Sequence, residues 1–255
     1  DIARIRDHIA LGDVYQITYC IKLRFDFLGD PRALYARLWR AQPVPYPAVI
    51  ETDEFQLLSL SPERFIKKDG NGVVTEPMKG TWPRGTDFLT DVFNRWQFSK
   101  DKKNRAENVM IADLLRNDLG RIGSGVRAPQ LFRITPYKTL FQMTSIVTAE
   151  INSRILFKDL FSAIFPSGSV TGAPKIRAME IIREIEREPR GIYTGAIGYI
   201  APNRDLYFNV PIRTVHIQGG VAEMGIGGGI IWDSTAEGEW AEGILKARFM
   251  TDVCE

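Results

Sequence analysis

The chain is predicted to be an α+β protein in which β-sheets pack in a sandwich and are flanked by helices. Strand-like segments follow one another in long runs, and the helical segments are segregated from them. This arrangement does not fit a doubly wound nucleotide-binding fold, in which strands and helices alternate one by one. Since no linker, repeat or low-complexity tract interrupts the pattern, we expect one compact domain over residues 1–255.

The first third of the chain contains two predicted helices and a series of strands. A helix is expected over residues 2–11, ended by Gly12. Over residues 15–25 apolar side chains occupy every second position, which is typical of a strand. Residues 31–42 favour a helix, because Pro31 suits a first helical turn. Shorter strands are predicted over residues 48–52, 55–60, 64–68 and 73–77.

The remainder of the chain continues with both kinds of element. A long helix is predicted over residues 102–119, ended by Gly120, and a strand rich in β-branched residues over 139–150. Further helices are expected over residues 157–165, 173–187 and 236–250. Strands are predicted between the last two of these, over residues 194–201, 206–210, 212–218 and 221–225.

Composition excludes several classes of protein. The chain is 44% hydrophobic and 25% charged, and its net charge of +2 does not argue for nucleic acid or an anionic membrane. No apolar run approaches the roughly 18 residues of a membrane span, so we expect a cytoplasmic protein. Cys20 and Cys254 do not have the spacing of a disulfide framework or zinc site. With only His8 and His216, histidine-based catalysis is not expected.

A run of small residues over 167–180 leads into the helix predicted from residue 173. Pro174 suits the first helical position, Thr171 can cap, and the helix start presents free N–H groups that can bind an anion. From the pattern alone, an ordinary capped helix is the favoured interpretation. The buried stripe of this helix is expected to contain Ile176, Met179, Ile182 and Ile185.

A second glycine-rich turn, over residues 225–230, would let backbone approach a ligand closely. No helix follows it directly, so it does not match a dinucleotide fingerprint. Glu239 and Glu242 share one helix face, and Glu107 lies near the start of the 102–119 helix. Three such carboxylates would suit Mg²⁺ if they converged, although charged helix residues are more often solvated.

A series of motifs occurs in one order along almost the whole chain, over residues 12–16, 61–65, 76–85, 105–108, 113–118, 167–180, 195–199, 227–229 and 233–242. Together they resemble the chorismate-utilising enzymes, and within that family the component I subunits of aminodeoxychorismate synthases. The resemblance implies that residues 1–255 form the family's large chorismate-binding catalytic domain. The family's N-terminal region is then absent or very short, and a natural short form, a fragment and a trimmed chain all remain open.

The resemblance also implies where a metal and the substrate bind. Glu107 and Glu242 would hold Mg²⁺, with Glu239 nearby or contributing through water, and the metal would meet the ring carboxylate of chorismate. Tyr193 and Arg213 would bind the enolpyruvyl carboxylate. The same pocket would be completed by Ser169, Gly172, Ala173, Lys175 and the backbone of Gly228 and Gly229.

A few positions separate family members that share this substrate. Isochorismate and salicylate synthases carry a water-activating lysine where this chain has Gln16, and anthranilate synthases a small residue in place of Lys79. Where anthranilate synthases have a histidine implicated in losing pyruvate, this chain has Gln142. The implied mechanism uses Lys79 as nucleophile at C2 of the ring and Glu63 as general acid at the C4 hydroxyl. Ammonia then adds at C4 and gives 4-amino-4-deoxychorismate, a precursor in 4-aminobenzoate and folate biosynthesis.

Ammonia is expected to come from a separate glutamine amidotransferase subunit, because the chain has no nucleophilic cysteine with a histidine partner. Two alternatives remain at this stage. Anthranilate synthase component I is the nearest other enzyme, and a non-catalytic chorismate-family binding subunit is the alternative of another class.

Overall fold

The computed structural model describes residues 1–138 and 140–254, without the side chains of Phe249 and of residues 251–254. The chain divides into two compact units, each with its own antiparallel sheet. The first unit comprises Asp1–Pro62, Val170–Ile197 and Val210–Glu255, and the second comprises Glu63–Ser169 and Gly198–Asn209. The predicted α+β class is confirmed, while the packing of one sheet on another and the single domain over residues 1–255 stay predictions.

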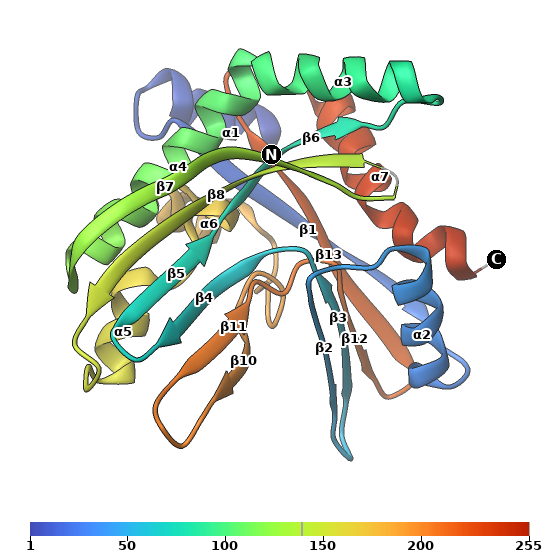
Figure 1. Ribbon diagram of the computed structural model, residues 1–255. Helices are drawn as coiled ribbons and strands as arrows, with labels where there is room; N and C mark the ends of the chain where they lie inside the picture. Colours follow the sequence, from blue (N-terminus) through green and yellow to red (C-terminus); the bar gives the residue numbers. More distant parts are fainter. Residues whose placement is uncertain (139, 255) are drawn as a thin grey trace. The chain divides into compact units, whose positions relative to one another are not determined.

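The sheet of the first unit is built around two long strands that run side by side (Figure 1). Across this sheet the order is β2 (Tyr46–Glu51), β3 (Gln56–Ser61), β12 (Thr214–Gln218), β13 (Val221–Ile230), β1 (Gln16–Asp26) and β9 (Gly172–Ala173). The helices of this unit are α1 (Ile2–Ala10), α2 (Pro31–Ala41), α6 (Lys175–Ile185) and α7 (Ala236–Cys254). The alternation predicted over residues 15–25 is therefore confirmed as β1.

One face of this sheet forms the hydrophobic core. Near one end of β1 and β13, Ile17 and Ile230 pack with Ile5 of α1 and Ile181 of α6. Further along, the helices α2 and α7 cover a second cluster that includes Met224. Because side chains alternate between the faces of a strand, Gln16, Thr18 and Cys20 of β1 lie on the opposite face from this core.

The sheet of the second unit is dominated by the long antiparallel pair β7 and β8 (Figure 1). Its order is β10 (Ile197–Ile200), β11 (Leu206–Asn209), β4 (Arg64–Asp69), β5 (Gly72–Glu76), β8 (Leu140–Ile151) and β6 (Met78–Pro83), with β7 (Gly123–Pro136) also paired to β8. Its helices are α3 (Phe88–Lys100), α4 (Lys102–Gly120) and α5 (Phe157–Ile164), and a short 3₁₀ turn covers Gly168–Val170. Helix α4 packs against β6, β7 and β8.

Three elements of the second unit were not predicted from the sequence. Strand β7 is interrupted by repeated register shifts against β8, so its side chains do not alternate in a regular way. Helix α3 leaves most of its large apolar side chains exposed, although its capping box between Asp87 and Thr90 was a usable signal. Strand β6 is short and has a register shift of its own. Thr139, predicted to start a strand, lies outside the described residues.

The prediction for the 173–187 helix was wrong in two respects. Helix α6 begins at Lys175, Pro174 precedes it, and no described side chain caps it. Ala173, which was expected to open the helix, lies instead in β9, which pairs with the start of β1. The buried stripe was predicted in part: Ile185 is buried and Ile182 packs against the same core, but Ile176 is 74% exposed and Met179 41% exposed, and Ala178 and Ile181 are buried in their place.

The glycine-rich segment over residues 225–230 is part of strand β13 and not a turn. Its glycines are required by close packing. A Cβ on Gly227 would lie 2.3 Å from the Tyr19 carbonyl oxygen, and one on Gly225 would lie 2.2 Å from the ring of Tyr193. No helix among the described residues is long and apolar enough to cross a membrane.

Candidate active site

Glu63 is a buried carboxyl group at the start of the second unit, between β3 and β4. The Ser169 hydroxyl donates a hydrogen bond of 2.5 Å to its Oε1 atom, and the Ser167 hydroxyl lies 2.8 Å from that of Ser169. Burial raises the pKa of Glu63 to about 7, against the opposing effects of the Ser169 hydrogen bond and the positive charge of Lys79. A carboxyl group with this pKa is protonated in a useful fraction near neutrality, as a general acid must be.

Lys79 is held in place by its backbone. Strand β6 places it between two residues paired with β8, at a shift in register. Its carbonyl oxygen accepts a hydrogen bond of 3.3 Å from the Asn108 amide, and the Ser145 hydroxyl donates to the Asn108 oxygen. The next residue, Gly80, has φ +96°, and a Cβ there would lie 2.8 Å from Asn104 Oδ1. Helix α4 therefore lies against Lys79 and Gly80, and its Asn108 side chain binds the Lys79 carbonyl oxygen.

Gln142 lies in β8, opposite Thr81 of β6 and so close to Lys79 in the sheet. Its side chain is completely buried, and neither its oxygen nor its nitrogen has a hydrogen-bond partner among the described residues. A buried amide without partners is costly, so such a group indicates a missing polar ligand or water. The sequence singled out this residue, but not its burial.

In the first unit, a second buried amide lies beside the predicted substrate turn. Gln16 pairs with Ala173, and both polar atoms of its side chain are buried without a partner among the described residues. Gly172 has φ +155°, and a Cβ there would lie 2.2 Å from the Gln16 carbonyl oxygen, so only glycine fits. Lys175 is the first residue of α6 and is half-buried.

Tyr193 and Arg213, the residues predicted to bind a carboxylate, both lie in the first unit in unusual backbone settings. The Tyr193 ring lies against the backbone of Gly225, and burial raises the pKa of its phenol well above the usual value. Arg213 has φ +50°, and Thr194, which follows Tyr193, has φ +61°. Left-handed backbone is uncommon outside glycine and tends to occur where a side chain must be aimed for function.

The predicted metal ligands of α7 face strand β13. Glu239 Oε1 accepts a hydrogen bond of 2.6 Å from Ser234, whereas its Oε2 is buried without a partner among the described residues. A Cβ on Gly228 would lie 2.7 Å from that Oε2 and 3.6 Å from Glu242 Oε1. The shared face predicted for these two carboxylates is confirmed. Gly229 is the next residue of β13 and pairs with Thr18.

Lys246, which was not predicted from the sequence, lies beside these carboxylates. Lys246 Nζ lies 2.6 Å from Glu242 Oε1 and donates a hydrogen bond of 2.8 Å to the Gly227 carbonyl oxygen. Its position four residues after Glu242 was the available signal. The third predicted ligand, Glu107, lies in α4 of the second unit. Among the described residues, no group of three His, Cys, Asp or Glu side chains stands ready to hold a metal.

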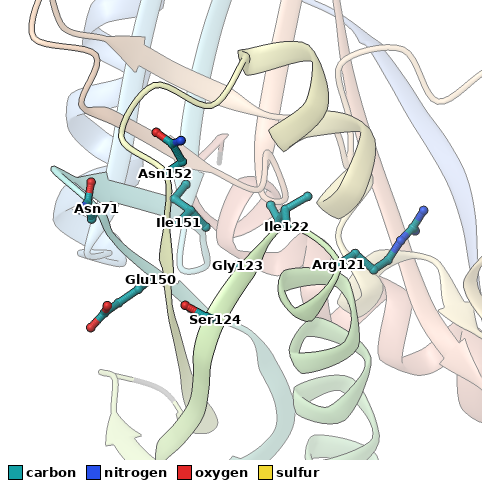
Figure 2. A pocket seen from close by; sticks show the side chains of 8 residues that line it. All are labelled: Asn71, Arg121, Ile122, Gly123, Ser124, Glu150, Ile151 and Asn152. Atoms are coloured by element: carbon teal, nitrogen blue, oxygen red, sulfur yellow. The ribbon is translucent and has the colours of Figure 1, made fainter.

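A separate open hollow of about 490 Å³ lies in the second unit, where α4 ends and β7 begins. Figure 2 shows Arg121 and Glu150 pointing away from each other at its two sides. It is lined by Asn71, Arg121, Ile122, Gly123, Ser124, Glu150, Ile151 and Asn152, and it includes none of the predicted site residues.

Known proteins resemble this chain over nearly its whole length. The family model of the chorismate binding enzymes matches residues 1–252. The chain is 38% identical over 256 residues to aminodeoxychorismate synthase component 1 of Bacillus subtilis (strain 168), covering 100% of this chain and 54% of that protein. It is 34% identical over 256 residues to anthranilate synthase component 1 of Aquifex aeolicus (strain VF5), covering 100% and 52%.

A solved structure is also similar. The crystal structure of anthranilate synthase component I from Streptococcus pneumoniae TIGR4 matches with a TM-score of 0.90 and 32% identity, covering 98% of this chain and 56% of that one. The chain thus spans about half the length of the curated relatives it matches. The match to the family model and the identity to these relatives show that the chain belongs to the chorismate-binding enzymes.

Proposed function

We propose that the protein is component I of an aminodeoxychorismate synthase, which converts chorismate and ammonia to 4-amino-4-deoxychorismate. The observation that carries the proposal is Lys79, whose charge acts on the buried carboxyl group of Glu63. The positive charge of Lys79 lowers the pKa of Glu63, so the proposed nucleophile and the proposed proton donor interact within one unit. The relative from Bacillus subtilis, named aminodeoxychorismate synthase component 1, supports the same activity.

The proposed reaction proceeds through a covalent adduct. The neutral amine of Lys79 attacks C2 of the ring, both ring double bonds shift, and the C4 hydroxyl group leaves as water after taking the proton of Glu63. Ammonia then adds at C4, both double bonds shift back, and the C2–nitrogen bond to Lys79 breaks. The lysine regains its amine, and one proton returns to the Glu63 carboxylate.

Two buried amides support amination over the related reactions. Gln16 stands where a lysine would activate water, and an amide cannot act as that base, so hydroxide delivery is disfavoured. Gln142 is not a proton donor of the strength of an imidazolium, which fits an enzyme that retains the enolpyruvyl group. Both amides lack protein partners among the described residues, so each is available to hydrogen-bond a polar group of the substrate.

Substrate binding is assigned to residues of both units, each taken on its own. Chorismate carries two carboxylates, and Arg213 and Tyr193 suit one of them because a guanidinium group and a phenol both donate hydrogen bonds. The remaining proposed contacts come from Ser169, Gly172, Ala173, Lys175, Gly228 and Gly229.

A magnesium ion is proposed to be held by Glu107 and Glu242, with Glu239 nearby. The first unit fits a cation, because Glu239 Oε2 is buried without a partner among the described residues and the Lys246 ammonium group already lies against Glu242. When bound, the ion would draw negative charge from the ring carboxylate of chorismate. Glu239 and Glu242 are therefore expected to supply charge and position, and not to transfer protons.

The ammonia source is proposed to be a separate glutamine amidotransferase subunit, consistent with the component 1 in the names of the relatives. The one alternative that an observation favours is anthranilate synthase component I, because the Aquifex aeolicus relative has that name. The two activities differ in the ring carbon that receives nitrogen, C4 or C2.

Lys79→Ala should abolish the adduct. If Lys79 is the nucleophile, the rate of formation of 4-amino-4-deoxychorismate should fall by several orders of magnitude. The wild-type protein, incubated with chorismate and Mg²⁺ without ammonia, should show a mass increase on the peptide that contains Lys79. Lys67→Ala, which changes an exposed lysine in β4 of the same unit, is the matched control and should behave as wild type. Fluorescent anthranilate as the wild-type product with ammonium salts would instead establish the alternative enzyme.

Glu63 should control the dependence of activity on pH. The acid must be protonated, so kcat/KM should fall as pH rises through about 7, and Glu63→Gln should remove this limb. Stability gives an independent check. The folded pKa lies above the unfolded value of 4.5, so the contribution of Glu63 to the free energy of unfolding decreases as pH rises through this interval. From pH 5 to pH 8, the free energy of unfolding measured with urea should decrease by about 2 to 3 kcal/mol more for the wild type than for Glu63→Gln. Parallel losses would show that this carboxyl is not perturbed.

Metal binding can be tested without turnover, by calorimetric titration with Mg²⁺. Glu242→Gln should weaken binding, while changing the free energy of unfolding by less than about 0.5 kcal/mol because the helix face is exposed. Lys246→Met should tighten it, roughly tenfold, because the ammonium group competes with the ion for Glu242. Lys22→Met, which breaks a lysine–glutamate pair between β1 and β13, serves as the control. Equal affinity in all variants would exclude Glu242 as a ligand.

The source of nitrogen is tested with the isolated chain. Ammonium salts should support turnover of chorismate, whereas glutamine should not, since no glutaminase residues are present in the sequence. The readout is the amount of 4-amino-4-deoxychorismate formed with each nitrogen donor. Glutamine-dependent turnover by the purified chain alone would contradict the proposed partner.

A further inference from the structure

Arg190 is a nearly buried arginine in the first unit that neither the motifs nor the proposed mechanism uses. It lies between the end of α6 and Tyr193, and its side chain is 15% exposed. A guanidinium group has five N–H donors, and each of them can be matched here to an acceptor. The side-chain acceptors are Glu186 Oε2 at 2.8 Å, Glu186 Oε1 at 2.7 Å and Thr194 Oγ1 at 3.3 Å. The backbone acceptors are the carbonyl oxygens of Thr18 at 2.7 Å and Val170 at 2.6 Å.

The charge of Arg190 is balanced by Glu186, whose side chain is only 6% exposed. The two nitrogen–oxygen contacts form a bidentate pair, the geometry in which an arginine and a carboxylate fix each other's orientation. Glu186 Oε1 also accepts a hydrogen bond of 3.0 Å from the backbone N–H of Cys20. The pair is therefore bound to strand β1 from both partners.

Arg190 joins three segments that are far apart in the sequence. Its bond to Thr18 reaches β1, and its bond to Val170 reaches the residues just before the Gly172–Ala173 strand. The Thr18 N–H donates a hydrogen bond of 2.7 Å to the Thr171 carbonyl oxygen, so the same two segments are also bonded directly. Its bond to Thr194 reaches the residue that follows Tyr193. One side chain thus connects the residues just before β9, strand β1 and the segment over residues 186–196 that contains Tyr193.

The Tyr193 segment lies outside the helices and strands, so loop and side-chain hydrogen bonds such as this connection hold it. Residues 186–196 form no helix or strand, and Thr194 adopts left-handed backbone with φ +61°. The Thr194 N–H donates a hydrogen bond of 3.1 Å to the Pro211 carbonyl oxygen. The Tyr193 ring packs against the backbone of Gly225. Strained backbone persists only where its surroundings hold it, and Arg190 supplies hydrogen bonds on one side of it.

We infer that Arg190, paired with Glu186, is a positioning residue that sets Tyr193 and the Gly172–Ala173 turn for substrate binding. The inference rests on the proposed function for the identity of the substrate, but the positioning of Tyr193 can be measured without it. Lysine cannot replace this arginine, because an ammonium group has three donors and no planar fork.

The experiment compares Arg190→Lys with Arg24→Met, which removes an exposed arginine of the same unit that is paired with Glu188 and Glu223. Arg190→Lys should raise KM for chorismate at least tenfold while changing kcat less than threefold, because Lys79 and Glu63 are not bonded to Arg190. The dissociation constant of chorismate, measured by calorimetry with Mg²⁺ and without ammonia, should rise with KM. Arg24→Met should leave all three unchanged.

A second readout separates this inference from the proposed function. In protein labelled with ¹³C at the tyrosine ζ carbon, the Tyr193 resonance should shift in Arg190→Lys and stay in place in Arg24→Met. If Arg190→Lys does not fold, Thr194→Val, which removes only the Thr194 acceptor, provides the same test with a smaller shift. An unmoved Tyr193 resonance would overturn the inference. A shifted resonance in a protein that does not bind chorismate would uphold it and refute the proposed function alone.

Discussion

The arrangement of the first unit depends on the absence of side chains along strand β13. This strand pairs with β1 over its whole length, and three of its glycines make room for groups that approach from both sides. Gly225 admits the Tyr193 ring, Gly227 admits the backbone of β1, and Gly228 admits the Glu239 carboxylate. A Cβ at Gly225 or Gly227 would lie closer than 3.0 Å to the Tyr193 ring or to the β1 backbone, so this packing requires glycine, whereas a Cβ at Gly228 would displace only the end of the flexible Glu239 side chain.

Glu63 of the second unit and Glu242 of the first unit lie in opposite environments, because Glu63 is buried and Glu242 is exposed. Glu63 has been removed from water with only partial compensation from Ser169 and Lys79, so the neutral form is favoured and the pKa rises. Glu242 keeps an ammonium partner at 2.6 Å and remains exposed to solvent. The first environment suits proton transfer and the second suits binding of a cation. Chemistry at C4 of a ring needs the former, and anchoring of a substrate carboxylate needs the latter.

The sequence predicted the parts of the fold in which local periodicity and burial agree. Strand β1 and helix α4 have regular patterns, and both were placed within one or two residues. Strand β7 could not be found in this way, because its register shifts break the alternation on which the prediction depends. The rotation of α6 was also hidden, since Ile176 and Met179 are as apolar as the residues that are buried. The packing of Ala178, Ile181 and Ile185 in the core of the first unit shows which face is inward.

For the candidate site, motif order supplied the predicted residues, while their electrostatic setting came only from the structure. The shared face of Glu239 and Glu242 follows from helical spacing. The pKa of Glu63 does not, because it depends on burial by segments far away in the sequence. Lys246 and Arg190 were missed for a related reason. Charged residues are usually solvated, and nothing in the sequence distinguishes an arginine with five protein acceptors from one in water.

The strongest sign that each unit is shaped for a ligand is a polar group that the protein leaves unsatisfied. Gln16 and Gln142 are both fully buried, and neither amide has a partner among the described residues. A buried amide without a partner carries a desolvation cost that replacement by an apolar side chain would remove. The Glu239 Oε2 atom is a third case. These groups lie beside Gly172 and Ala173, in the sheet close to Lys79, and against Gly228. A polar substrate, a cation or water would offset this cost, so the location of these atoms supports the proposed placement of the ligands.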